Sequence, residues 1–304
     1  MTDTTAPNLR PLGVGDIVDR TIGLYRASPA LFLVLAALPY IVLALVSLAL
    51  NLVFVRTTPL TKLPTNVFDP NGFSTSFTPE EIAGFAVFGA VITVVSVIVL
   101  SVQAAAIVDA MSKRYLGQPT TIGESLRAGL RASVRLILAS IIAFVSFIVL
   151  ITMAVVVLAI VTAAIGNPLP AIIGGIAVFV LILYVVASWM PLPAVVTLEG
   201  RGPVDGIRRA WGLAGGARWR ILGLLTLVSI LQGILGILFA FIFLGTIVTE
   251  GVAKTVLQEV ANLAVNALWA PIQWGVFTLL YYDLRVRKEA FDLQLAAESI
   301  PRAT

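Results

Sequence analysis

The sequence predicts an all-α integral membrane protein with six transmembrane helices. Apolar residues make up 59% of the 304 residues and charged residues only 12%. A soluble domain of this length needs a polar shell that such a composition does not supply, whereas several membrane spans require this bias. Length supports the same fold class, because six apolar segments each reach about 20 residues, enough for a helix to cross about 30 Å of hydrocarbon.

The six predicted spans follow one another along the whole chain, with no separate soluble domain. They are residues 30–55, 82–108, 134–164, 169–190, 221–248 and 260–282. The apolar run of the first is too long for the h-region of a signal peptide, so we expect an uncleaved span. Residues 56–81 are predicted to form the loop between the first two spans, and residues 284–304 a tail after the last.

Lys and Arg are distributed unevenly between the two sides of the predicted bundle. The connections on one side hold only Arg56, Lys62 and Lys254, and all other basic residues lie on the side of the termini. The positive-inside rule then places both termini and the tail in the cytoplasm, and the 56–81 loop outside. Because the basic residues lie in short segments beside spans, we expect anionic phospholipids as partners and no nucleic acid.

A similar polar segment precedes the first span of each successive pair of spans. Each begins with an acid that is followed three or four residues later by Arg, and apolar residues occupy the other face. The acid–Arg pairs are Asp16 and Arg20, Glu124 and Arg127, and Asp205 and Arg208. Each segment is predicted to be an interfacial amphipathic helix, or elbow, before a helical hairpin. The fold therefore reads as three repeats of elbow plus hairpin, at about residues 11–115, 119–200 and 202–290.

Local signals place several helix ends. Thr121 and Glu124 have the spacing of a capping box, so a helix is predicted to begin after Thr121. Thr78 followed by Pro79 predicts the start of the second span. The residues Gly166-Asn167-Pro168 predict a tight turn between spans 3 and 4.

Two strings of residues carry a family resemblance. They are Trp189-Met190-Pro191-Leu192-Pro193 through Glu199-Gly200-Arg201-Gly202-Pro203 and Arg208-Arg209-Ala210-Trp211-Gly212-Leu213, and Leu12-Gly13-Val14-Gly15-Asp16-Ile17-Val18-Asp19-Arg20. They resemble the membrane-domain family of glycerophosphoryl diester phosphodiesterases, in the form of a stand-alone bacterial member without the phosphodiesterase domain. The resemblance implies a membrane module in the inner (plasma) membrane of a bacterial cell.

Catalysis is not predicted for this chain. A phosphodiesterase site resembling the known ones needs His residues and a carboxylate-bound metal in a soluble barrel, and the chain has no His and no Cys. Disulfides, ordinary zinc or haem ligation, and Cys or His chemistry are thereby excluded, and no metal or cofactor is expected. Gly13-Val14-Gly15-Asp16 and Tyr282-Asp283 match strings of intramembrane aspartyl proteases, but we interpret both acids as capping or interfacial residues at helix ends.

Two sets of polar residues are candidate sites. Glu259, Asn262, Asn266 and Gln273 share one side of the sixth span and form a polar transmembrane seam. The seam either bonds neighbouring helices or lines a path for a ligand or ion. A cluster of Arg208, Arg209, Arg218 and Arg220 with Trp211 and Trp219 predicts a membrane-interface anchor; the alternatives are recognition of a particular phospholipid and docking of a cytoplasmic partner. The residues expected to meet anionic lipid headgroups are Arg127, Arg131, Arg208, Arg209 and Arg220.

Two functional classes follow from these patterns. The first is a non-enzymatic integral membrane module that binds lipid or a partner membrane protein, because Arg residues dominate the elbows and no catalytic set is evident. The alternative is a small transporter or efflux subunit that uses the seam. The sequence has no P-loop, so energy coupling in that case would require an ATPase on another chain.

Overall fold

The computed structural model describes residues 10–57, 78–242 and 251–294, and within these residues it contains helices and no strands. Most of the predicted 56–81 loop and the last ten residues of the predicted 284–304 tail lie outside the described residues. The expectations about those two segments therefore stay predictions.

Among the described residues, six helices are long and apolar enough to cross a membrane, as predicted, and they support a multi-pass membrane protein. They are α2 (Pro29–Thr57), α3 (Pro79–Tyr115), α4 (Ile122–Ile165), α5 (Leu169–Trp189), α8 (Arg218–Ile242) and α9 (Gly251–Glu289). Apolar side chains on their outer surfaces are exposed, for example Phe144 on α4 and Ile173 on α5. Such side chains can contact lipid tails because the helical backbone satisfies its own hydrogen bonds.

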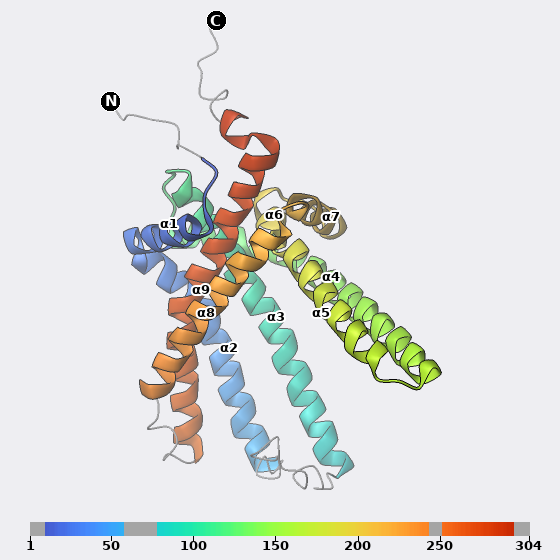
Figure 1. Cartoon of the computed structure of the whole chain (residues 1–304). Helices are drawn as coiled ribbons and strands as arrows, with labels where there is room; N and C mark the ends of the chain where they lie inside the picture. The colour runs from blue at the N-terminus through green and yellow to red at the C-terminus, as the bar shows by residue number, and fades with distance from the viewer. Residues whose placement is uncertain (1–9, 58–77, 243–250, 295–304) are drawn as a thin grey trace, which may run out of the picture.

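Three shorter helices gather with the C-terminal end of α9 at one end of the molecule, which we call the basic end (Figure 1). They are α1 (Val14–Ala27), α6 (Leu192–Leu198) and α7 (Pro203–Ala214). In α1 and α7 one face is buried, including Ile17 and Leu213, while the acid of the first turn is exposed. Both helices are therefore amphipathic, as the elbow pattern predicts.

The second elbow differs from the prediction, because it is not a separate helix. Residues of the elbow and of span 3 form the single 44-residue helix α4. It begins at the predicted capping box, in which the Glu124 N–H donates to Thr121 Oγ1 at 3.3 Å and the Thr121 N–H donates to Glu124 Oε2 at 3.1 Å. No proline interrupts the helix between the elbow and the span, so nothing in the backbone ends it there. Short α6, which follows α5, was not predicted.

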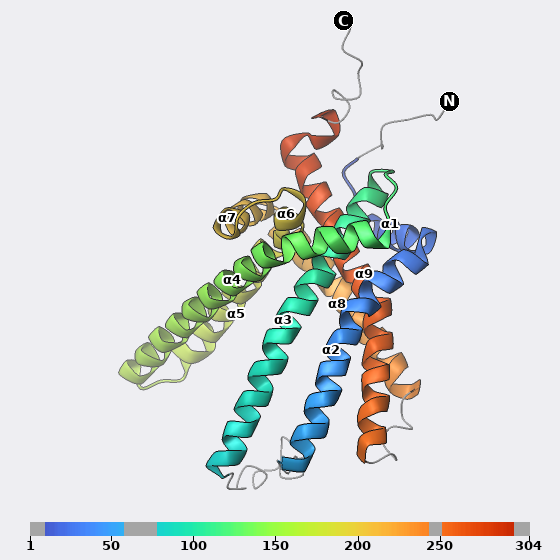
Figure 2. The same ribbon diagram turned by 180° about the vertical axis from the view of Figure 1, so that it is seen from behind.

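The predicted turn between spans 3 and 4 is confirmed. Gly166 ends α4 in the left-handed conformation with φ of 67°, which glycine adopts without steric cost. The Leu169 N–H then donates to Asn167 Oδ1 at 2.9 Å and starts α5. The α4–α5 hairpin slants away from α2, α3 and α9 in both views (Figure 2).

The core lies mainly near the basic end, where α3, α4 and α9 cross their neighbours. Ala104, Ala105 and Ala106 of α3 are buried, and α4 approaches α3 closely at Gly129, beside Val102 and Ala106. On the other side of α3, α9 packs against α2 and α1. The element order agrees with elbow-plus-hairpin units, but the threefold repeat and the membrane orientation stay predictions.

Candidate functional site: the basic end

Asp283 near the end of α9 is the centre of a buried ionic cluster. Its side chain is completely buried, forms a salt bridge with Arg220 of α8 and accepts from Arg287 Nε at 3.1 Å. The Leu12 N–H donates to Asp283 Oδ1 at 2.8 Å, and both arginines donate to the Leu12 carbonyl. This cluster fixes the segment before α1, the start of α8 and the end of α9 to one another.

A second cluster surrounds Glu199, directly after α6. Glu199 accepts hydrogen bonds from Arg209 Nε at 3.1 Å and from the Tyr281 hydroxyl at 3.0 Å, and forms a salt bridge with Arg201 at 2.6 Å. Burial alone would raise the pKa of Glu199, but the hydrogen bond from Arg201 and the charge of Arg209 outweigh burial and lower that pKa. Arg209 also donates to Glu289 Oε2 at 2.8 Å, so this cluster joins α6, α7 and α9.

Two arginines of the expected headgroup set, Arg209 and Arg220, have carboxylate partners within the chain. Both guanidinium groups form salt bridges with acids of the chain itself, so their expected contact with lipid headgroups stays a prediction. A buried carboxylate needs such a partner, because an unpaired charge would carry the full cost of desolvation. Glu199 is ten residues away from Arg209, but Glu289 is 80 residues from Arg209 and Asp283 is 63 residues from Arg220, and no local pattern reveals pairs at those longer separations.

The other three arginines of the expected headgroup set are exposed. Arg127 and Arg131 lie on the elbow part of α4, and Arg208 lies on α7, which packs against α4. Within residues 10–57, 78–242 and 251–294, none of the three has an acidic partner. Their charge is therefore available to an anion outside the chain.

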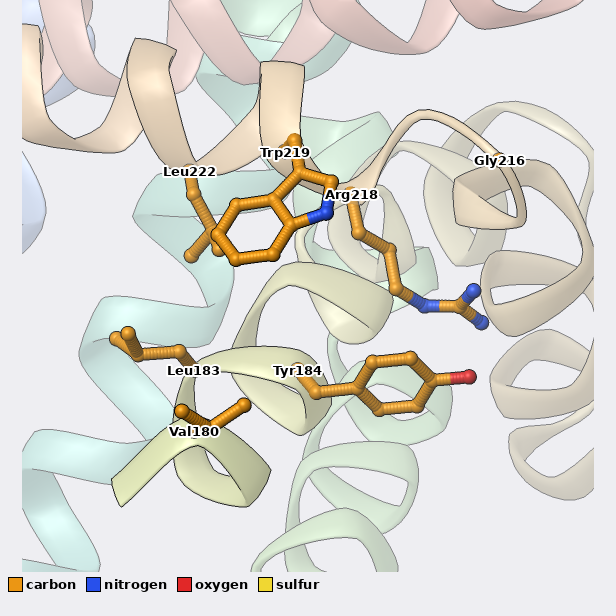
Figure 3. Close-up of a pocket in the computed structure, with 7 residues that line it drawn as sticks. All are labelled: Val180, Leu183, Tyr184, Gly216, Arg218, Trp219 and Leu222. Carbon is orange, nitrogen blue, oxygen red and sulfur yellow. The ribbon is translucent and has the colours of Figure 1, made fainter. Parts of the chain in front are cut away.

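Arg218, at the start of α8, also lacks a carboxylate partner in the described part of the chain, but its surroundings are more enclosed. It lines a half-enclosed cavity of about 240 Å³ between α5 and α8, together with Tyr184, Trp219 and Leu222 (Figure 3). Its Nε donates to Ser188 Oγ at 2.8 Å, and its Cζ lies 4.1 Å from the centre of the Tyr184 ring. The sequence predicts that Arg218 and Trp219 lie at the membrane interface. It does not reveal that Tyr184 and Ser188 of α5 contact Arg218, because that contact depends on the packing of α5 against α8.

A family model described as a domain of unknown function (DUF7847) matches residues 12–284. The chain belongs to this family. No curated protein and no solved structure matches it. The resemblance to the membrane domain of glycerophosphoryl diester phosphodiesterases stays a prediction, because the DUF7847 match does not connect the two families.

The region of the DUF7847 match begins and ends at the Asp283 cluster. Its first residue, Leu12, bonds to Asp283 through its backbone N–H. Asp16, the acid of the protease-like string, accepts from the Gly13 N–H at 2.9 Å and caps α1, as we interpreted it. Asp283 is held by two arginines. Both acids are therefore occupied by contacts that stabilise the fold.

The polar seam of this DUF7847 chain lies on α9, and it faces α2 in part. Ser47 Oγ donates to Glu259 Oε1 at 2.6 Å, and the Asn266 side chain lies beside the Tyr40 hydroxyl. Gln273 is half-buried, whereas Asn262 is exposed. These contacts with α2 favour helix–helix bonding over a path for a ligand.

Proposed function

We propose that this protein is a non-enzymatic membrane module that binds anionic phospholipids at its basic end. The observation that carries the proposal is the separation of the arginines into two groups. One group neutralises buried acids, and a second group, which includes Arg127, Arg131 and Arg208, is exposed without an acid among the described residues. Positive charge beside membrane spans attracts anionic headgroups by about 1 kcal/mol for each Lys or Arg near the surface.

The position of the second group supports phospholipid as the ligand. The three arginines lie on the polar faces of helices whose other faces are buried in the protein, at the end where the apolar spans meet polar residues. Phosphate groups of a bilayer lie at this level relative to the spans. By the positive-inside rule this is the cytoplasmic leaflet, which carries the anionic lipids.

The test compares lipid retention by full-length variants purified from mixed phosphatidylglycerol and phosphatidylcholine. The triple variant Arg127→Gln, Arg131→Gln, Arg208→Gln should retain less phosphatidylglycerol than wild type. If the three cations act additively, the loss approaches about 3 kcal/mol, or about a hundredfold in affinity. Native mass spectrometry and lipid quantification both measure this ratio.

The matched control replaces the same three residues by Lys, which keeps the charge. This variant should retain most of the phosphatidylglycerol preference. A second control, Lys254→Gln, removes a cation from the opposite end and should leave the lipid ratio unchanged. Equal phosphatidylglycerol retention by wild type and by the triple Gln variant would rule out headgroup binding by these residues.

A further inference from the structure

A groove runs along α8 from Arg218 to Ile230, beside the last part of α5. Its upper part is the half-enclosed cavity around Arg218 (Figure 3). Its lower part is a more open cavity of about 400 Å³ lined by Leu225, Ser229 and Ile230. Leu183 and Leu222 line both cavities, so the two parts join. We call this the α5–α8 groove.

The upper end of the groove presents an oriented cation. The Arg218 guanidinium is fixed by the hydrogen bond to Ser188 Oγ and by stacking on Tyr184, and its Cζ lies 5.4 Å from the centre of the Trp211 ring. Only Nε is used by the hydrogen bond that the structure shows. The two terminal nitrogens can therefore donate in parallel to two oxygens of one phosphate, which is the geometry that guanidinium groups favour.

The rest of the groove is mostly apolar, with Thr226 and Ser229 as its polar lining residues, and along α8 it is about as long as one lipid leaflet is thick. Arg218 and Ile230 are twelve residues apart on α8, which corresponds to about 18 Å along a helix. One leaflet contributes about half of the 30 Å hydrocarbon thickness. Trp219 beside the mouth is 81% exposed, as is common for Trp at the headgroup level. The groove thus offers a hydrogen-bond donor for a phosphate group at one end. Its remaining, mostly apolar wall is about as long as an acyl chain.

We propose that the α5–α8 groove holds one anionic phospholipid, with its phosphate on Arg218 and one acyl chain along Leu183, Leu222 and Leu225. This inference rests on the proposed function and specifies a single site for it. The groove site differs from the exposed arginines of α4 and α7, because its cation is pre-oriented and its ligand is also held by apolar contact. The groove lipid should therefore be the last to dissociate.

The experiment titrates the delipidated full-length protein with phosphatidylglycerol in detergent and follows bound lipid by native mass spectrometry. Wild type should retain one phosphatidylglycerol molecule under conditions that remove the others. Arg218→Gln should weaken this site at least about tenfold, because a charge-assisted hydrogen bond to phosphate is lost. Arg218→Lys should have an intermediate effect, since it keeps the charge without the paired donors.

A second variant tests the apolar part without changing charge. Ser229 is exposed on the groove wall, so Ser229→Trp should fill the groove and also weaken the site about tenfold. The matched control Ile234→Trp places the same side chain on an exposed position of α8 that does not line the groove, and it should bind like wild type. Free glycerol 3-phosphate, at the same concentration as the lipid, should not displace the bound molecule.

The outcomes separate this proposal from the more general one. If wild type binds phosphatidylglycerol no better than phosphatidylcholine, lipid recognition at the basic end is overturned as a whole. If wild type prefers phosphatidylglycerol but Arg218→Gln and Ser229→Trp retain the tightly held lipid, only the groove site is overturned. Displacement by glycerol 3-phosphate at equal concentration would overturn the role of the acyl chain.

Discussion

The arginines of the basic end differ in what their guanidinium groups contact. Arg220 and Arg287 meet the completely buried carboxylate of Asp283, whereas Arg218, two residues before Arg220, meets Ser188 and an aromatic ring. Neighbouring arginines of one segment therefore differ in their contacts: Arg220 pairs with a buried acid, whereas Arg218 has no acidic partner among the described residues.

The buried carboxylate of Asp283 should be essential for stability. Asp283→Asn keeps the side-chain shape but leaves Arg220 and Arg287 without a counter-charge, and because both arginines are partly exposed the cost should lie below the about 3–5 kcal/mol typical of fully buried pairs. We expect the variant to unfold at a clearly lower temperature in detergent micelles. The control Asp19→Asn changes an exposed acid of α1 and should unfold near wild type. Similar unfolding temperatures for Asp283→Asn and Asp19→Asn would contradict the proposed role of the cluster.

At the scale of elements, the crossing of α3 and α4 depends on small residues. A Cβ atom at Gly129 would lie 2.8 Å from the Val102 carbonyl oxygen and 2.9 Å from Ala106 Cβ. Close approach through Gly and Ala is a usual source of helix association in membranes, where lipid tails are as apolar as the side chains. The crossing holds the elbow part of α4, which carries Arg127 and Arg131, against the rest of the basic end.

Gly129→Ala should therefore destabilise the protein although Ala favours helix formation. The added methyl group must displace backbone of α3, and overpacking of this kind costs about 1–3 kcal/mol. The matched control is Gly123→Ala on the same helix, where a Cβ atom would meet nothing within 4 Å. That control should be neutral or stabilising by up to about 1 kcal/mol. Thermal unfolding of both variants measures the difference, and equal effects would argue against a tight crossing.

At the scale of the whole molecule, the connections between spans that the structure describes lie at two opposite ends. The turn between α4 and α5 lies at the end opposite to α1, α6 and α7 (Figures 1 and 2). The charge bias predicts that the basic end faces the cytoplasm. All exposed arginines used in our proposals would then meet the same leaflet.

Cysteine labelling tests this orientation directly, because the chain contains no native Cys. Asn167→Cys in the α4–α5 turn should react with an impermeant thiol reagent added to intact cells. Gln118→Cys, exposed between α3 and α4 at the basic end, should react only after the membrane is permeabilised. Labelling of Gln118→Cys in intact cells would invert the predicted topology.

The sequence by itself determined the features that depend on local composition. Apolar length identified the six spans, the Thr121–Glu124 spacing located the start of α4, and Gly166 with Asn167 located its end. The amphipathic faces of α1 and α7 were also evident. These features follow from hydrocarbon thickness, backbone hydrogen bonding and helix periodicity. Each of these is determined by a stretch of sequence between a few and about twenty residues long.

Tertiary structure alone decided which charges remain available. Arg209 and Arg220 satisfy every sequence criterion for headgroup contact, yet packing brings Glu199, Glu289 and Asp283 against them. Packing also joins Tyr184 and Ser188 of α5 to Arg218 of α8, and so forms the groove. An ion pair or a groove wall depends on distances between residues far apart in the chain, and only the packing of α5 through α9 sets those distances.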